Sequence, residues 1–213
     1  MTDDVVAEQV DYYRRRAAEY DATAYGDLAV ARPRIARLVE QMRPAGRVLE
    51  IACGTGVWTE PLAAYADSLT AVDFAPEALA IARERVTSPN VTFVVADVFD
   101  WTSDAQFDVI FFSAWLSHVP PERFGAFWDS LRPMLADGGR VLFLDEHVDE
   151  RGKESYLREG VVERRLSDGS TFRVVKHFVE PDAMTARLRE LGWECDIQRD
   201  GDDWVLGEAR PRF

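Results

Sequence analysis

The chain contains five short, nearly continuous runs of apolar residues, separated by stretches in which apolar positions recur at helical spacing. Helices are predicted in three of these stretches, over 58–66, 76–86 and 121–135. Strands that alternate with helices of this length predict a parallel sheet covered by helices on both faces. The runs are RVLEIA (47–52), SLTAVDF (68–74), VTFVVAD (91–97), FDVIFFSA (107–114) and GRVLFLDE (139–146).

The two ends of the chain depart from this alternation. Helices are predicted before the first strand, over about 3–20 and 29–42. After the fifth strand, 161–178 reads as two strands joined at an Asp-Gly turn, followed by a helix over 181–191 and a second hairpin across residues 201–202. The pattern predicts an α/β fold with a seven-stranded, mostly parallel sheet, its last strand antiparallel, and an inserted β-hairpin.

Composition narrows the possible partners. The 213 residues, 47% hydrophobic and 30% charged, fit one globular domain. The net charge of −13 repels phosphate backbones and anionic membranes, so we expect no nucleic-acid and no membrane partner. The basic run at 14–16 reads as a solvated helix face. Two distant cysteines and the lack of a long apolar segment predict a cytoplasmic protein without disulfides, and no cluster has the spacing of a metal site.

The first strand ends in a glycine loop, LEIACGTG (49–56). Gly54 and Gly56 allow the backbone to approach a ligand closely near the start of a helix. The dinucleotide fingerprint GxGxxG would place a third glycine where this chain has Thr59, and the bulky Trp58 crowds the same turn. An NAD-dependent oxidoreductase is therefore an alternative of lower rank.

Acidic residues end the next two strands at similar spacing. Asp73 can accept hydrogen bonds from both ribose hydroxyls of an adenosine. Asp97 can accept from an adenine amino group, with Val98 or Phe99 against the ring. Three successive strand ends thus carry groups that suit one nucleoside ligand at the carboxyl edge of the sheet.

These motifs resemble those of the class I S-adenosylmethionine (SAM)-dependent methyltransferases of the small-molecule type. The resemblance covers roughly residues 10–146 and is carried by EIACGTG (50–56), AVDFAPEAL (71–79), VVADVFD (94–100), FDVIFFSAWLSHVP (107–120) and LRPMLADGGRVLFLDE (131–146), with YYRRRAAEYD (12–21) similar to the family's lid segment. It implies a strand order of 3-2-1-4-5-7-6 and a single domain. Residues 1–45 would form a helical lid, 46–146 the SAM-binding core, and 147–213 the substrate-side hairpin and terminal strands.

The resemblance also implies roles for individual residues. Gly54 and Gly56 would lie against the methionine part of SAM, Asp73 would hold the ribose and Asp97 the adenine. Ala52 stands where many relatives have glycine, and we expect only a modest change in the loop. The other residues expected to bind the cofactor are Tyr12, Tyr20, Glu50, Trp58, Phe74, Val98, Phe99 and Ser113.

Methyl transfer from a sulfonium is an in-line displacement, and a nucleophile with a high pKa also needs a base. His118 follows the fourth strand at the sheet edge and is the candidate base, with a packing or capping histidine as the alternative. His147 follows the fifth strand and is the second catalytic candidate, with a supporting or surface role as the alternative. Tyr13, Trp115 and Tyr156 are expected to contact the substrate beside His118.

The acceptor is predicted to be a small molecule and the protein to be a monomer or a homodimer. The pattern does not select among O-, N-, C- and S-methylation. A non-catalytic SAM-binding protein stays open as an alternative, because intact cofactor residues fit it equally well.

Overall fold

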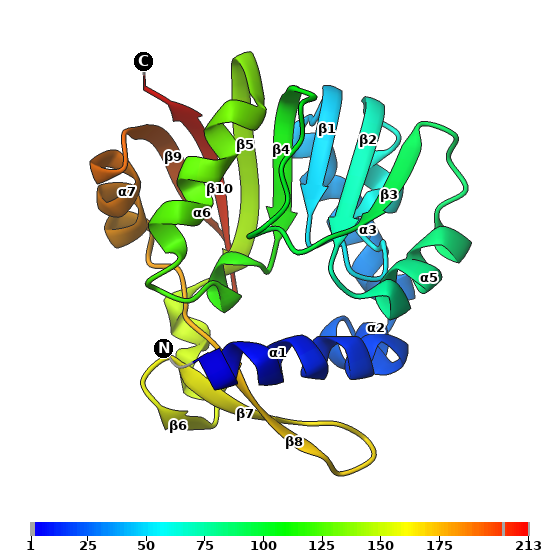
Figure 1. Cartoon of the computed structure of the whole chain (residues 1–213), viewed down its shortest axis with the longest axis vertical. Helices are drawn as coiled ribbons and strands as arrows, with labels where there is room; N and C mark the ends of the chain where they lie inside the picture. Colours follow the sequence, from blue (N-terminus) through cyan, green and yellow to red (C-terminus); the bar gives the residue numbers. More distant parts are fainter. Residues whose placement is uncertain (1–2, 202, 213) are drawn as a thin grey trace.

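The computed structural model describes residues 3–201 and 203–212. Within them, seven strands form the central sheet in the order β3-β2-β1-β4-β5-β10-β9 (Figure 1). Strands β1 to β5 pair in parallel, and β10 is antiparallel to both β5 and β9. The predicted order and antiparallel last strand are confirmed. The strands are β1 (Gly46–Ile51), β2 (Ala66–Asp73), β3 (Val91–Val95), β4 (Phe107–Ser113), β5 (Leu135–Glu146), β9 (Trp193–Asp200) and β10 (Trp204–Pro211).

Both faces of this sheet are buried, which explains why its inner strands are nearly continuous apolar runs and do not alternate between apolar and polar residues. In β4, Val109 and Phe111 pack on one face, whereas Ile110 and Phe112 pack on the other. Each apolar side chain fully buried in this way contributes roughly 1.5–3 kcal/mol relative to an exposed one. Helices α3 and α4 cover the first face, and α6 and α7 cover the second.

The helices of the sheet layers begin and end near the predicted positions, with two differences. The predicted helix over 58–66 shrinks to α4, because β2 already begins at Ala66. The predicted helix over 121–135 is shortened to α6 and a 3₁₀ turn over 132–134. The helices are α3 (Leu28–Met42), α4 (Thr59–Leu62), α5 (Pro76–Arg85), α6 (Phe124–Leu131) and α7 (Pro181–Glu190).

A cap lies across the carboxyl edge of the sheet (Figure 1). It consists of α1 (Asp3–Arg16), a 3₁₀ turn (Ala17–Glu19), α2 (Tyr20–Ala24) and a small antiparallel sheet of β6 (Tyr156–Arg158), β7 (Val161–Arg165) and β8 (Thr171–Val175). Tyr12 of α1 packs against Val162 and Val174 of this sheet. The inserted hairpin is therefore present, and β6 adds a strand that the sequence did not predict.

The predicted lid over 1–45 divides into two parts. Helices α1 and α2 belong to the cap, whereas α3 packs on the central sheet through Ile35, Leu38 and Val39. The turn predicted at 201–202 includes Asp202, which lies outside the described residues. Among the described residues, no helix is both long and apolar enough to cross a membrane.

Candidate active site

Two adjoining chambers lie between the cap and the carboxyl edge of the sheet. The loop chamber, beside the glycine loop, has an empty volume of about 570 Å³, which includes space open to solvent. The cap chamber, beneath α1, α2, β7 and β8, has an empty volume of about 1090 Å³, which also includes space open to solvent. The two chambers are neighbours, because both are lined by Tyr13, Tyr20, Ser113, Ala114 and His118.

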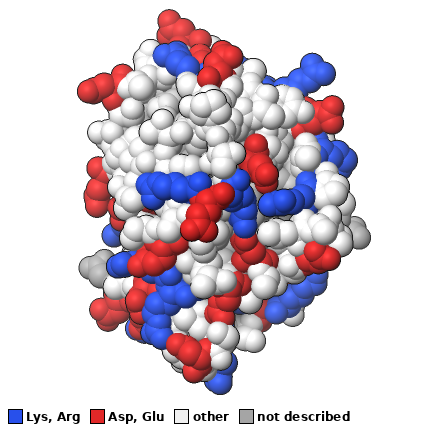
Figure 2. Space-filling view, turned by 90° about the vertical axis from the view of Figure 1, so that its right-hand side faces the viewer, with Lys and Arg blue, Asp and Glu red and all other residues white. Residues whose placement is uncertain are grey.

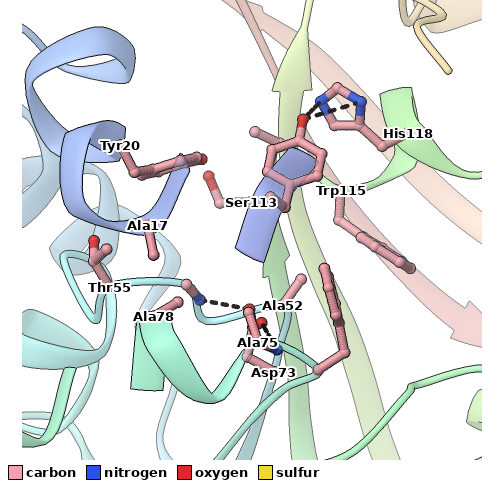
Figure 3. A pocket seen from close by; sticks show the side chains of 14 residues that line it. Ala17, Tyr20, Ala52, Thr55, Asp73, Ala75, Ala78, Ser113, Trp115 and His118 are labelled. Carbon is pink, nitrogen blue, oxygen red and sulfur yellow. Dashed lines mark hydrogen bonds between the residues drawn. The ribbon is translucent and has the colours of Figure 1, made fainter. Parts of the chain in front are cut away.

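Asp73 braces the glycine loop from the end of β2. One of its carboxylate oxygens accepts from the backbone N–H of Gly54 and the other from that of Ala75, both at 2.8 Å (Figure 3). The side chain is only 6% exposed, and this burial raises the pKa of the Asp73 carboxyl. A carboxylate oxygen can accept more than one hydrogen bond, so Asp73 remains able to bind a hydroxyl in the chamber.

The backbone of the loop has a positive φ at three positions, Ala52, Gly54 and Gly56. Gly54 has φ +53°, and a Cβ built on it would meet no protein atom within 4 Å. Glycine therefore leaves space free beside the loop chamber that it lines. Ala52 has φ +55°, which costs a residue with a Cβ roughly 1–2 kcal/mol. The chain holds Ala52 in this conformation at that cost, and the modest change expected in the loop stays a prediction.

Several of the residues predicted to bind the cofactor are brought together here. In Figure 3, Tyr20 of α2 and Ser113 at the end of β4 point toward one another above the glycine loop. The chamber is closed on the cap side by Ala17 and Tyr20. The predicted residues that line the loop chamber are Tyr13, Tyr20, Ala52, Gly54, Asp73, Phe74, Ser113, Trp115 and His118.

Other predicted cofactor residues lie behind this lining. Gly56 packs against α5, where a Cβ would come within 3.0 Å of the Ala82 Cβ. Trp58 is buried in the core, 5.6 Å between ring centroids from Phe111. Neither residue lines a chamber, so the direct contacts predicted for them are not supported.

The residues predicted to hold the adenine are not among those that line the loop chamber, and their adenine contacts stay predictions. The Asp97 carboxylate accepts from the backbone N–H of Phe99 at 2.9 Å and so holds the turn after β3. Val98 is buried in the core, and Phe99 packs on Trp115 with ring centroids 5.6 Å apart. These residues support the wall of the loop chamber rather than line it. Tyr12 is buried against β7 and β8 and lines only the cap chamber.

Glu50 is a buried carboxyl at the end of β1. Its side chain is 2% exposed, and one carboxyl oxygen has no hydrogen-bond partner among the described residues. Burial raises the pKa of Glu50 to about 8, with the nearby Asp73 adding to the effect. Glu50 lines neither chamber, so its predicted contact with the cofactor stays a prediction.

His118 stands where the two chambers meet. Its Nδ1 lies 2.7 Å from the carbonyl oxygen of Val175. Its Nε2 lies 2.9 Å from the Tyr13 hydroxyl, and dashed lines at His118 in Figure 3 mark the contact with this hydroxyl. A carbonyl can only accept, so Nδ1 carries the proton and Nε2 accepts from Tyr13. Burial, with the nearby Lys176 as the next cause, holds the pKa of His118 well below its ordinary value, and the ring is neutral.

The second predicted catalytic residue, His147, and the predicted substrate residue Tyr156 lie away from the two chambers. His147 is buried and caps a 3₁₀ turn, its Nδ1 accepting from the backbone N–H of Asp149 at 3.2 Å. Tyr156 packs against the cap sheet beneath the guanidinium of Arg151. Neither lines either chamber, so the roles predicted for them are not supported.

The cap chamber holds functional candidates that the sequence prediction missed. The basic run at 14–16 was interpreted as a solvated helix face, but Arg16 turns into this chamber. Arg164 and Lys176 reach it from β7 and just after β8, and Tyr25 lines it from the end of α2. Their positions depend on the fold of the cap, which no local motif encodes.

The glycine loop, the acidic strand end and the enclosed chamber at the carboxyl edge define the site of a SAM-dependent methyltransferase. A family model described as a methyltransferase domain matches residues 48–139. An uncharacterized methyltransferase of Staphylococcus carnosus is 32% identical over 71% of this chain and 74% of that protein. The chain belongs to the SAM-dependent methyltransferases, and SAM is its cofactor.

Solved structures extend the similarity over the whole chain. DhpI in complex with S-adenosylhomocysteine (SAH) has a TM-score of 0.87 and 40% identity, covering 100% of this chain and 99% of that one. DhpI with SAM and HEP has a TM-score of 0.88 and 39% identity, covering 99% and 100%.

A shorter similarity is found to nodulation protein S of Rhizobium tropici, 34% identical over 47% of this chain and 43% of that protein. The chain spans about half the length of the nodulation proteins it matches. The relatives named here that carry an enzyme name are methyltransferases, so the oxidoreductase alternative is wrong.

Proposed function

We propose that this protein moves the methyl group of SAM to a nucleophilic atom of a small molecule held in the cap chamber. The observation that carries the proposal is the contact between the two chambers. Five residues line both, so a donor in the loop chamber and an acceptor in the cap chamber would meet at that boundary. The solved complex of DhpI with SAM and HEP supports a donor and a second compound in one such fold.

The residues of the loop chamber fit the cofactor. Asp73 is placed to accept from the ribose hydroxyls, and the space beside Gly54 is free of protein atoms. SAM supplies an already activated methyl group when it is bound. The protein therefore acts mainly by aligning two ligands and by excluding water, and the cap supplies the excluding surface. The general-base role predicted for His118 stays a prediction at this level.

The proposal is tested by turnover with small acceptors alone. We would incubate the protein with SAM that carries a labelled methyl group and a broad panel of small alcohols, amines, thiols and acids, and follow SAH and labelled product. Acceptor-dependent SAH formation is expected. Tight SAH binding without turnover on any member of the panel would instead favour the non-catalytic alternative.

Substitution of Asp73 offers a sharper test of the proposed cofactor binding. An Asp73→Asn variant loses the charge of the ribose acceptor, and hydrogen bonds to charged groups contribute about 1.5–3 kcal/mol. We expect SAH affinity to fall by roughly 10- to 100-fold in calorimetry. Asp67→Asn is the matched control, because Asp67 is an exposed carboxylate near the start of the same strand. Equal affinity in the two variants would remove the ribose assignment.

A further inference from the structure

We propose that the cap chamber binds a small oxyanion, a carboxylate or a phosphoryl group, and that the charged oxygen of this group receives the methyl. The inference rests on the proposed function, because it names the acceptor of the same site. It is carried by three cations that the fold turns into the chamber of an otherwise acidic protein.

Lys176 is the most unusual of these cations. Its side chain is only 2% exposed, although a buried ammonium is costly unless it is paired. The Nζ atom lies 2.7 Å from a carboxylate oxygen of Glu146 and 3.4 Å from the Ser117 hydroxyl. An ammonium has three donors, and these two contacts leave capacity for a third acceptor in the chamber that Lys176 lines.

Arg164 enters the chamber from β7. Both of its terminal nitrogens are held by the Glu154 carboxylate, whose side chain is 11% exposed. A guanidinium has five N–H donors, so this pairing fixes its orientation and leaves other donors free. Glu154 does not line the chamber, whereas Arg164 does. The carboxylate thus supports the guanidinium from behind.

Arg16 completes the set from α1. Its guanidinium donates to the Thr23 hydroxyl and lies 4.7 Å from the centroid of the Tyr20 ring. Within the described part of the chain, no carboxylate forms an ion pair with it. Arg16 therefore brings a positive charge into the chamber without a compensating carboxylate at ion-pair distance.

The charge of the chamber opposes the charge of the chain. Arg16, Arg164, Arg165 and Lys176 line it against two carboxylates, Glu19 and Glu146, while the whole chain carries −13. On the outer face shown in Figure 2, basic and acidic side chains are interspersed. A concentration of one sign in an enclosed cavity selects ligands of the opposite sign.

The hydrogen bonds at the boundary fit a nucleophile that is already ionised. The Nε2 atom of His118 is occupied by the Tyr13 hydroxyl, and the ring is neutral. The Glu146 carboxylate is paired with Lys176. An oxyanion has no proton to lose, so its methylation needs no general base, and the base role predicted for His118 would be required only by a neutral nucleophile. The oxygen–methyl bond forms as the methyl–sulfur bond breaks, the electron pair stays on sulfur, and no proton moves.

The test uses protein saturated with SAH, so that any cation engaged by the cofactor's own carboxylate is already occupied. Acetate and monomethyl phosphate are titrated in as probes, with tetramethylammonium and methanol as cationic and neutral counterparts. Saturable binding of at least one oxyanion, and of neither counterpart, is expected. The two oxyanion probes distinguish a carboxylate from a phosphoryl site.

Variants locate the binding. Arg164→Gln and Lys176→Gln should each weaken the bound oxyanion by at least about tenfold. Arg158→Gln is the control, because Arg158 is exposed on the same small sheet and lines neither chamber. Since loss of a buried lysine can impair folding, the ring nitrogen signals of His118 are also followed by NMR in the unaltered protein. They should shift with the oxyanion and not with tetramethylammonium.

Three results would overturn the inference while leaving the cofactor assignment intact. One is SAH binding with no oxyanion binding. Another is oxyanion binding that Arg164→Gln and Lys176→Gln leave unchanged. The third is a turnover product methylated on a neutral amine, thiol or hydroxyl instead of on the oxyanion. Failure of SAH itself to bind would contradict the proposed function first.

Discussion

The two glycines of the glycine loop have different roles: one borders the space for the ligand, and the other packs against the rest of the fold. Gly54 borders open space, whereas Gly56 has φ +80° and lies against Ala82. The two glycines look equivalent in the sequence, and only the packing of α5 separates them. The loop motif therefore predicts the site correctly but not the task of each glycine.

This difference gives a stability prediction for Gly56. In Gly56→Ala, the new Cβ is strained by the positive φ and crowds the Ala82 Cβ, so we expect a loss of at least about 1–2 kcal/mol. Gly152→Ala is the control, since its Cβ would meet no atom within 4 Å, and it should stay within about 0.5 kcal/mol. Urea unfolding measures both. Equal stability of the two variants would contradict the packing role.

Glu50 is expected to make stability depend on pH. Burial raises its pKa from 4.5 to about 8, so the folded protein holds this proton more tightly than the unfolded chain. Its contribution to stability is therefore fully present at low pH and is lost as pH rises from about 4.5 through 8. Glu50→Gln, which mimics the protonated form, should melt higher than the unaltered protein at pH 8.5, with a smaller difference at pH 5.5. A constant difference would contradict the assignment.

Secondary-structure elements cooperate through the cap. Asp21 of α2 accepts from the Thr55 hydroxyl in the glycine loop at 2.5 Å and pairs with Arg85 of α5. Gln9 of α1 donates to the carbonyl of His118 at 3.1 Å and accepts from the N–H of Val175 at 2.9 Å. The first contact fastens the cap to the cofactor side, and the second fastens α1 to β8 over the chamber boundary.

The Asp21 contact is expected to slow cofactor exchange. In Asp21→Asn the charge that holds Arg85 is lost, so the cap should open more often and SAH should dissociate several-fold faster in stopped-flow measurements. Asp11→Asn provides the comparison, because Asp11 is exposed on α1 and pairs only loosely with Arg15 at 3.8 Å. An unchanged dissociation rate in Asp21→Asn would mean that another contact limits opening.

The helices and strands show which parts of the fold could be predicted from the sequence and which could not. The doubly buried strands and the chain order of the glycine and acidic motifs were predictable, because periodicity and motif spacing are local properties. The break of the first helix at 17–19, the strand β6 and the inward turn of Arg16 were not. These features depend on how α1 packs against β7 and β8, which is a long-range contact.

At the scale of the whole molecule, the chain combines a covered sheet with a cap that has its own smaller clusters of buried residues. Val5, Val161 and Val175 form one of these clusters, separate from the two main cores. Regions with less buried apolar surface open at lower free energy than the core. The cap is therefore the part of the molecule suited to admit and release ligands.

Hydrogen exchange should show this division. We expect amides of α1 and α2 to exchange faster than those of the central strands, and SAH to slow the former by tenfold or more. Amides of β9 and β10, which lie at the far edge of the sheet, should change little. Uniform protection of all elements by SAH would contradict a cap that opens independently.

The central claim is that the loop chamber binds SAM and its product SAH. Calorimetric titration of the purified protein with SAH tests it most directly, since no acceptor is needed. Saturable binding at one site per chain, lost or strongly weakened in Asp73→Asn and retained in Asp67→Asn, is the expected result. A folded protein that does not bind SAH at millimolar concentration would contradict the account.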